Sequence, residues 1–233
     1  MSFKADIGVI GALSDEVASI IDRLEDRREA TVSGIEFNYG YISGKAVVVA
    51  KCGVGKVFAA LCAEAMIIRF SPSLLINSGV GGALAPGLAP CDIVFAERLV
   101  QHDMDTSPLG DPIGLVSGIN KIYFECDGRA NGILSSLARE KGINFLVGTV
   151  ATGDRFIAEG ADKAKIVERF GASACEMEGG AIAQVAFVNA TPCVVIRAIS
   201  DSADGVASMD YPTFLPIATK ISTALTLGLI ERY

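Results

Sequence analysis

Short, almost wholly apolar runs alternate along the chain with longer segments in which apolar side chains recur at helical spacing. The runs Ile7–Gly11, IGVIG, and Cys193–Ile199, CVVIRAI, are too short for typical helices and rich in Val and Ile. Such runs are typical of strands that are buried on both faces. From Val17 to Leu24 the apolar residues recur at helical spacing, so a helix with Ser14 as its N-cap is expected on one sheet face.

The same two patterns predict the other elements. A hairpin is expected from Ile35–Ile42 and Ala46–Ala50, which flank Ser43-Gly44-Lys45. Further strands are expected at Leu74–Asn77, Asp92–Ala96, Ile119–Phe124 and Phe145–Ala151, and helices at Val57–Phe70, Ala130–Glu140, Ala161–Phe170, Ala181–Val188 and Pro212–Leu229. The alternation favours one α/β domain over residues 1–233, a three-layer α/β/α fold with a mixed, mostly parallel twisted sheet.

Polar residues follow the ends of the first and last predicted strands. Glu16 lies just beyond Ile7–Gly11, and Ser200 and Asp201 follow Cys193–Ile199 directly. Ligands of open α/β sheets bind at the carboxyl ends of strands, so these side chains are candidates for a site. At the rim of an apolar interior, burial favours the neutral form of Asp201, which can donate a proton. A purely structural role, as helix caps or first-turn acids, explains both carboxylates as well.

Three other segments contain candidate site residues. The segment CEMEGGAIA places Glu178 in apolar surroundings, where an acid needs a partner or a role. The glycine-rich turns Cys52–Lys56 and Ser78–Gly82 are expected to bring the backbone close to a ligand or a neighbour. Phe156 lies on a loop and suits stacking on a flat ring or filling the core. Acids in distinct environments suit acid–base chemistry on a glycosidic-type bond.

Composition restricts the partners. The net charge of −7 disfavours nucleic acids and anionic membranes as partners. The six cysteines are scattered without a CxxC pair, which predicts a reducing cytoplasm and neither disulfides nor zinc. We expect no signal peptide, and no apolar stretch of about 20 residues that spans a bilayer. His102 is the only histidine, so no Ser–His or Cys–His arrangement and no multi-histidine metal site is predicted.

Seven motifs span the chain in order: IGVIGALSDEV, CGVGKV, INSGVGGAL, QHDMD, TGDRFI, CEMEGGAIA and RAISDSAD. Together they resemble the 5′-methylthioadenosine/S-adenosylhomocysteine nucleosidases of the purine nucleoside phosphorylase superfamily. The resemblance implies a nucleoside phosphorylase-like fold, no metal or organic cofactor, and hydrolysis of the N-glycosidic bond of both nucleosides in methionine salvage. It also implies a homodimer in which Asp103–Gly118 reaches towards the neighbour's site.

The resemblance further implies a role for each site residue. Glu16 would position and deprotonate the attacking water. Glu178 would bind the ribose hydroxyls and stabilise the oxocarbenium-like transition state, and Asp201 would share its proton with adenine N7. The remaining implied residues contact the substrate or support the acids: Met177, Val80 and Gly81 at the sugar, Phe156 and Ile157 at the purine, Ser200 and Arg197 at the Asp201 end, and Leu13, Val54 and Tyr211 at the sugar and thioether end.

Two other functions remain open. Phosphorylases of this superfamily carry an arginine where the chain has Asn77, and they lack an acid at the place of Glu16, which repels phosphate and suits water. A hydrolase is therefore favoured over a phosphorylase. A non-catalytic nucleoside sensor is the second alternative, because Val80 stands where the family often has Ser or Thr, and Thr106–Gly118 lacks aromatics found in some members. These departures leave futalosine-type substrates and 5′-deoxyadenosine open.

Overall fold

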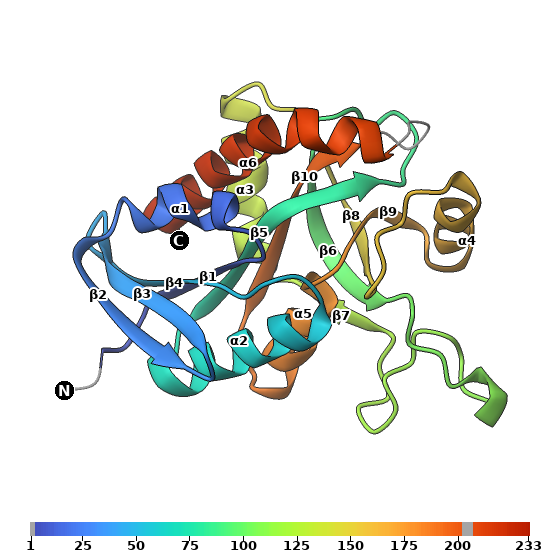
Figure 1. The fold of residues 1–233 in the computed structure, drawn as a ribbon, viewed down its shortest axis with the longest axis horizontal. Coiled ribbons are helices and arrows are strands. Elements are labelled where there is room, and N and C mark those ends of the chain that lie inside the picture. The colour runs from blue at the N-terminus through green and yellow to red at the C-terminus, as the bar shows by residue number, and fades with distance from the viewer. Residues whose placement is uncertain (1–2, 202–206) are drawn as a thin grey trace.

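The computed structural model describes residues 3–201 and 207–233, with the backbone alone for residues 207–213. Its centre is a ten-stranded sheet with helices on both faces (Figure 1). The helices α1 (Ser14–Ile21), α3 (Gly128–Glu140) and α6 (Ala207–Arg232) lie on one face, and α2 (Lys56–Phe70) and α5 (Gly179–Val188) on the other. The helix α4 (Gly160–Phe170) lies apart from both groups.

The sheet has the strand order β10-β6-β8-β9-β5-β1-β4-β3-β2, with β7 beside β6. The strands are β1 (Ile7–Gly11), β2 (Glu25–Val32), β3 (Ile35–Ile42), β4 (Lys45–Lys51), β5 (Leu74–Ala83), β6 (Ile93–Gln101), β7 (Tyr123–Glu125), β8 (Phe145–Thr152), β9 (Ala172–Glu176) and β10 (Cys193–Asp201). Because β10 also pairs with β5, the strands β5, β10, β6, β8 and β9 close into a ring.

The sheet is mixed, as predicted, but it has no parallel majority. Of the ten pairings between strands in the described part of the chain, five are parallel and five antiparallel. The strands β2, β3 and β4 are joined by two tight turns, and such turns allow only antiparallel pairing. The expectation of a mostly parallel sheet is therefore not confirmed, because the antiparallel pairings of β2, β7 and β9 help to balance the parallel ones.

Both missed strands have unusual sequences. The strand β2, EDRREATV, is charged and exposed, so it lacks the apolar run on which strand prediction relies. It lies at the sheet edge, where charged side chains discourage pairing with other chains. The strand β9 is only five residues long and wholly buried. Its pairing with β8 and β5 places Glu176, its last residue, in the interior.

Two local predictions also need correction. Ser78–Gly82 is not a turn: β5 continues through these residues to Ala83 and pairs in parallel with β10. Long-range pairing here overrides the low strand propensity of glycine. Ser14 is the first residue of α1 and not its N-cap, a position that Leu13 occupies.

The helix α6 is the one described helix that is long and apolar enough to cross a membrane, over Phe214–Arg232. No such stretch was expected from the sequence, but Phe214–Arg232 meets the criterion by length and composition. Half of the stretch is buried inside the molecule, and Ala218, Leu225 and Leu229 belong to the hydrophobic core. Such burial is typical of a core helix.

The contact between β2 and β3 gives a test of the fold. A Cβ atom at Gly40, on β3, would overlap the backbone carbonyl oxygen of Glu25. We expect Gly40→Ala to lower the free energy of unfolding by about 1–3 kcal/mol, measured by urea denaturation. The matched control is Gly132→Ala on α3, where a Cβ meets no atom within 4 Å. It should raise stability by about 0.5–1 kcal/mol, and equal effects of the two substitutions would contradict the predicted overlap.

Candidate active site

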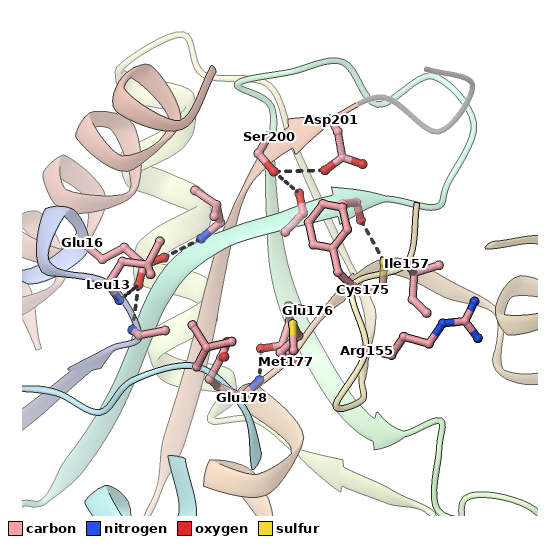
Figure 2. A pocket seen from close by; sticks show the side chains of 16 residues that line it. Leu13, Glu16, Arg155, Ile157, Cys175, Glu176, Met177, Glu178, Ser200 and Asp201 are labelled. Carbon is pink, nitrogen blue, oxygen red and sulfur yellow. Dashed lines mark hydrogen bonds between the residues drawn. The ribbon is translucent and has the colours of Figure 1, made fainter. Parts of the chain in front are cut away.

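A cavity of about 230 Å³ lies where β5, β9 and β10 end (Figure 2). Three predicted acids line it, namely Glu16, Glu178 and Asp201. The other predicted residues that line it are Leu13, Val54, Val80, Gly81, Phe156, Ile157, Met177 and Ser200. Arg197 is not part of this lining, and the side chain of Tyr211 lies outside the described residues.

Glu16 lies in the first turn of α1, directly after β1. Its Oε2 accepts hydrogen bonds from the backbone N–H groups of Ala12 and Leu13, at 2.7 and 2.9 Å. Its Oε1 accepts one from the N–H of Val80 at 3.1 Å. Burial raises the pKa of Glu16, although these hydrogen bonds and the charge of Arg197 oppose the rise. A fixed carboxylate with a raised pKa is suited to act as a general base.

Glu178 immediately precedes α5 and lines another side of the cavity. Its Oε1 accepts a hydrogen bond from the N–H of Gly55 at 2.9 Å. Gly55 has φ +100°, a conformation that favours glycine, so the turn Cys52–Lys56 brings its backbone close to a protein neighbour. Burial, followed by the negative charge of Glu176, raises the pKa of Glu178 to about 7.

Glu176 is a buried acid that the sequence analysis did not include in the site. Its Oε2 accepts hydrogen bonds from the backbone N–H groups of Glu178 and Gly179, at 2.9 and 2.7 Å. Its Oε1 accepts one from the hydroxyl of Thr152. These contacts attach the end of β9 to the first turn of α5 and thereby orient Glu178. The only signal in the sequence was the pair of acids within CEMEGG.

Arg197 forms a buried ion pair with Glu176 and also hydrogen-bonds the side chain of Asn77. Burial alone would raise the pKa of Glu176, but the charge and hydrogen bonds of Arg197 help to lower it below its usual value. The described hydrogen bonds of Arg197 go to Glu176, to Asn77 and to the backbone of Ile196, and its expected support of the Asp201 end stays a prediction.

Asn77 links this ion pair to the neighbouring strand. Its Nδ2 donates a hydrogen bond to the carbonyl oxygen of Ile10 at 3.0 Å, and its side-chain oxygen accepts one from Arg197. Asn77 is buried and does not line the cavity. Asn77 stands at the position where the phosphorylases were expected to carry an arginine. In this chain it joins β1 to the buried ion pair and does not contact the cavity.

Asp201, the last residue of β10, lies at the far side of the cavity from Glu16 (Figure 2). Its Oδ1 accepts a hydrogen bond from the hydroxyl of Ser200 at 3.1 Å. Its Oδ2 lies 3.0 Å from Nζ of Lys163, a residue of α4 that the sequence analysis missed.

Two glycines on β5 make room for these acids. A Cβ atom at Gly79 would lie 2.7 Å from Oε1 of Glu16, and one at Gly82 would lie 3.1 Å from Oδ2 of Asp201. Both distances are shorter than an ordinary van der Waals contact, so larger residues would displace the carboxyl groups. The two glycines therefore allow the side chains of Glu16 and Asp201 to lie directly against the backbone of β5.

The rest of the cavity wall is mainly apolar. Phe156 is 49% exposed at the cavity, which leaves part of its ring accessible to a planar ligand. Ile157, Met177 and Val54 add apolar surface. Within residues 3–201 and the described side chains beyond them, no group of three His, Cys, Asp or Glu residues could hold a metal ion. The arrangement provides carboxyl groups on several sides of an apolar cleft, which suits acid–base chemistry on a flat, uncharged ligand.

Comparisons with known proteins find similarity over nearly the whole chain. A family model described as the phosphorylase superfamily matches residues 6–231. The chain is 37% identical to the 5′-methylthioadenosine/S-adenosylhomocysteine nucleosidase of Haemophilus influenzae, over 97% of this chain and 98% of that protein. It is 35% identical to the aminodeoxyfutalosine nucleosidase of Campylobacter jejuni, again over 97% of this chain and 98% of the relative.

A solved structure is similar over the full length of the chain. It is the 5′-methylthioadenosine/S-adenosylhomocysteine nucleosidase of Helicobacter pylori with butyl-thio-DADMe-Immucillin-A. The TM-score is 0.94, with 33% identity and coverage of 100% of both chains.

The raised pKa of Glu178 predicts a pH dependence of stability. Its folded-state value of about 7 lies above the usual 4.5, so protonation stabilises the folded protein at low pH. This contribution is lost as the pH rises from about 4.5 to about 7. In Glu178→Gln the loss is absent, so the variant should gain stability relative to the wild type across this window.

Urea denaturation at several pH values between 5 and 8 measures this difference. The control is Glu168→Gln, which removes an exposed carboxyl group from α4. We expect the control to follow the wild type at every pH. If Glu178→Gln also ran parallel to the wild type, the raised pKa would be refuted.

Proposed function

We propose a reaction for the chain on the premise that it belongs to the phosphorylase superfamily and, within it, to the 5′-methylthioadenosine/S-adenosylhomocysteine nucleosidase family. The chain hydrolyses the N-glycosidic bond of adenine nucleosides that carry a 5′-thioether and releases adenine. The observation that carries this proposal is the cavity that Glu16, Glu178 and Asp201 line together, with Glu16 and Asp201 on different sides.

The three carboxyl groups divide the reaction. Glu16 is held by three backbone N–H groups and takes a proton from the attacking water. Asp201 delivers a proton to N7 of the purine, so the departing base leaves uncharged when the bond between C1′ and N9 breaks. Glu178 hydrogen-bonds the ribose hydroxyls and faces the positive charge that develops on the sugar. A general acid or base of this kind contributes about 10²–10⁴ in rate.

The position of Glu16 favours water over phosphate as the nucleophile. An ionised carboxylate on this wall repels a phosphate dianion, whereas it accepts a hydrogen bond from water. The nearby guanidinium group of Arg197 is already paired with Glu176, so it is not free to bind phosphate. Hydrolysis therefore suits the site better than phosphorolysis.

The substrates that we assign are 5′-methylthioadenosine and S-adenosylhomocysteine. The apolar wall at Met177 and Val54 suits the thioether, and Phe156 suits stacking on adenine. Aminodeoxyfutalosine is the second candidate, because a relative named for this substrate is 35% identical to the chain. Val80, which offers no hydroxyl near the sugar, leaves the 5′-substituent less restricted by hydrogen bonds.

The reaction belongs to the recycling of S-adenosylmethionine by-products for methionine salvage. We assign the enzyme to the cytoplasm, where reducing conditions suit a chain whose six cysteines are all free.

A second copy of the chain is the partner that we assign to the surface of α2 and α5. Val57, Phe58, Leu61 and Ile68 are exposed on α2, and Phe187 and Val188 on α5. Exposed apolar side chains gathered on neighbouring helices mark association surfaces. In this dimer the segment 103–118 of each copy, in which Leu109 is exposed, extends towards the cavity of the other copy.

Release of free adenine tests the reaction. Purified protein should release adenine from 5′-methylthioadenosine in buffer without phosphate, and chromatography should detect no ribose 1-phosphate. Asp201→Asn should lower kcat by about 10² or more with the fold intact by circular dichroism. A strict need for phosphate would assign a phosphorylase, and binding without adenine release would assign a sensor. Comparing kcat/KM for methylthioadenosine, adenosylhomocysteine and aminodeoxyfutalosine separates the substrate candidates.

Sedimentation velocity tests the association. The wild type should sediment as a dimer, and Phe58→Glu should shift it to a monomer because a charge replaces apolar surface on α2. Ile217→Glu is the matched control, since it changes an exposed apolar residue on α6, across the sheet from α2. A wild-type monomer at micromolar concentration would exclude the dimer.

A further inference from the structure

A buried ion pair joins the acid end of the cavity to α4. Nζ of Lys163 lies 3.0 Å from Oδ2 of Asp201, and the two residues are 4% and 1% exposed. Lysine is almost never buried so completely without a charged partner or a function. On the same helix, the side chain of Lys165 is 70% exposed and lies near Asp162. The burial of Lys163 is therefore specific to its position and not a property of the whole helix.

The pair raises a question about the proton that leaves with the purine. In an ion pair between an ammonium group and a carboxylate, the ammonium nitrogen carries the hydrogen atoms that can be donated. Yet the proposed reaction requires Asp201 to deliver one to N7. The ammonium group of Lys163 carries that proton within hydrogen-bond distance of Asp201.

We propose that Lys163 is a positioning residue that shares one proton with Asp201 and supplies the hydrogen that Asp201 passes to the departing purine. The inference rests on the proposed function. As the bond between C1′ and N9 breaks, its electron pair goes to the purine and Asp201 transfers a proton to N7. Lys163 passes its proton to Asp201 and becomes a neutral amine. Water adds to C1′ and gives its proton to Glu16, and exchange with solvent restores both groups.

Two titratable groups of β9 lie near the pair in the described part of the chain. Cys175, on β9, lies beside Asp201 and Lys163, and burial raises the pKa of its thiol to about 12, so it stays neutral. Glu176, also on β9, forms its own ion pair with Arg197. Neither described group can supply the proton or compete for the ammonium group.

Among the described residues, other charges near the pair lie in the loop before α4 and on α4 itself. Arg155 lines the cavity but forms an ion pair with Asp162, and its side chain is mostly exposed. A guanidinium group does not release its proton under ordinary conditions. Lys163 is therefore the described cation that combines burial, contact with Asp201 and a transferable proton.

The pH profile of the single-turnover rate on 5′-methylthioadenosine tests the inference. In model peptides an ammonium group holds its proton to about pH 10.4 and an aspartic acid to about pH 3.9. In Lys163→Met the proton must be held by Asp201 alone. We expect the rate at neutral pH to fall by about tenfold or more, and the alkaline limb to move to lower pH by at least about one unit. Lys165→Met, on the same helix, should match the wild type.

Lys163→Arg separates charge from proton supply. Arginine keeps the positive charge beside Asp201 but does not give up its proton, so this variant should be as slow as Lys163→Met. A wild-type rate in Lys163→Arg would overturn the inference, because the positive charge alone would then suffice. An unchanged alkaline limb in Lys163→Met would overturn it as well. If Lys163→Met fails to fold, the arginine variant still decides.

Two further measurements connect the effect to Asp201 and to the leaving group. In an Asp201→Asn background, Lys163→Arg should change the rate by less than about twofold. The amide of the asparagine cannot pass a proton from Lys163 to the purine, so there is no transfer left to lose. A 5-alkylthio-riboside of 4-nitrophenol needs no proton to leave, so the Lys163 variants should hydrolyse it at the wild-type rate. A loss as large as that seen with the adenine nucleoside would indicate a purely structural role and reject the inference.

The same experiments distinguish this inference from the proposed function. A wild type that releases no adenine from any of the nucleosides removes the proposed function, and the inference with it. A wild type that releases adenine, with Lys163→Arg equally active, removes the inference alone.

Discussion

The buried ion pair between Glu176 and Arg197 is the interaction on which the site depends. Glu176 accepts hydrogen bonds from the backbone N–H groups of Glu178 and Gly179, where α5 begins, and thereby orients Glu178. Arg197 contacts Asn77, which in turn binds the backbone of Ile10 on β1. Removing one partner of such a pair leaves an uncompensated buried charge and costs about 3–5 kcal/mol. The ion pair and its hydrogen bonds therefore form one polar network that connects β1, β5, β9, β10 and α5.

The ionised state of Glu176 also separates the behaviour of the acids above it. Its negative charge adds to burial in raising the pKa of Glu178 to about 7. Glu16 lies farther along the wall and is stabilised by backbone N–H groups, while Asp201 has an ammonium partner. Of the four acids that line the cavity, Glu16, Glu178 and Asp201 thus have three different environments, which allows one to accept a proton while another donates.

Closure of five strands into a ring determines where these partners meet. The strand β10 pairs with both β5 and β6, and β9 pairs with both β8 and β5, so the ends of three strands converge on one cavity. Glycines at 79 and 82 let side chains of α1 and β10 lie directly against β5. A residue with a side chain at either place would push a carboxyl group away from the substrate.

Local pattern and motif were enough for most of the elements and for Glu16, Glu178 and Asp201, because apolar runs, helical spacing and acids after strands are short-range features. The charged strand β2 and the extension of β5 through its glycines were missed, since long-range pairing stabilises both against their local preference. The partners of the acids depended on the fold alone. Lys163 and Asp201 are 38 residues apart in the chain, and no periodicity connects them. Only the tertiary structure brings the two charges within hydrogen-bond distance, so the sequence by itself could not identify them as partners.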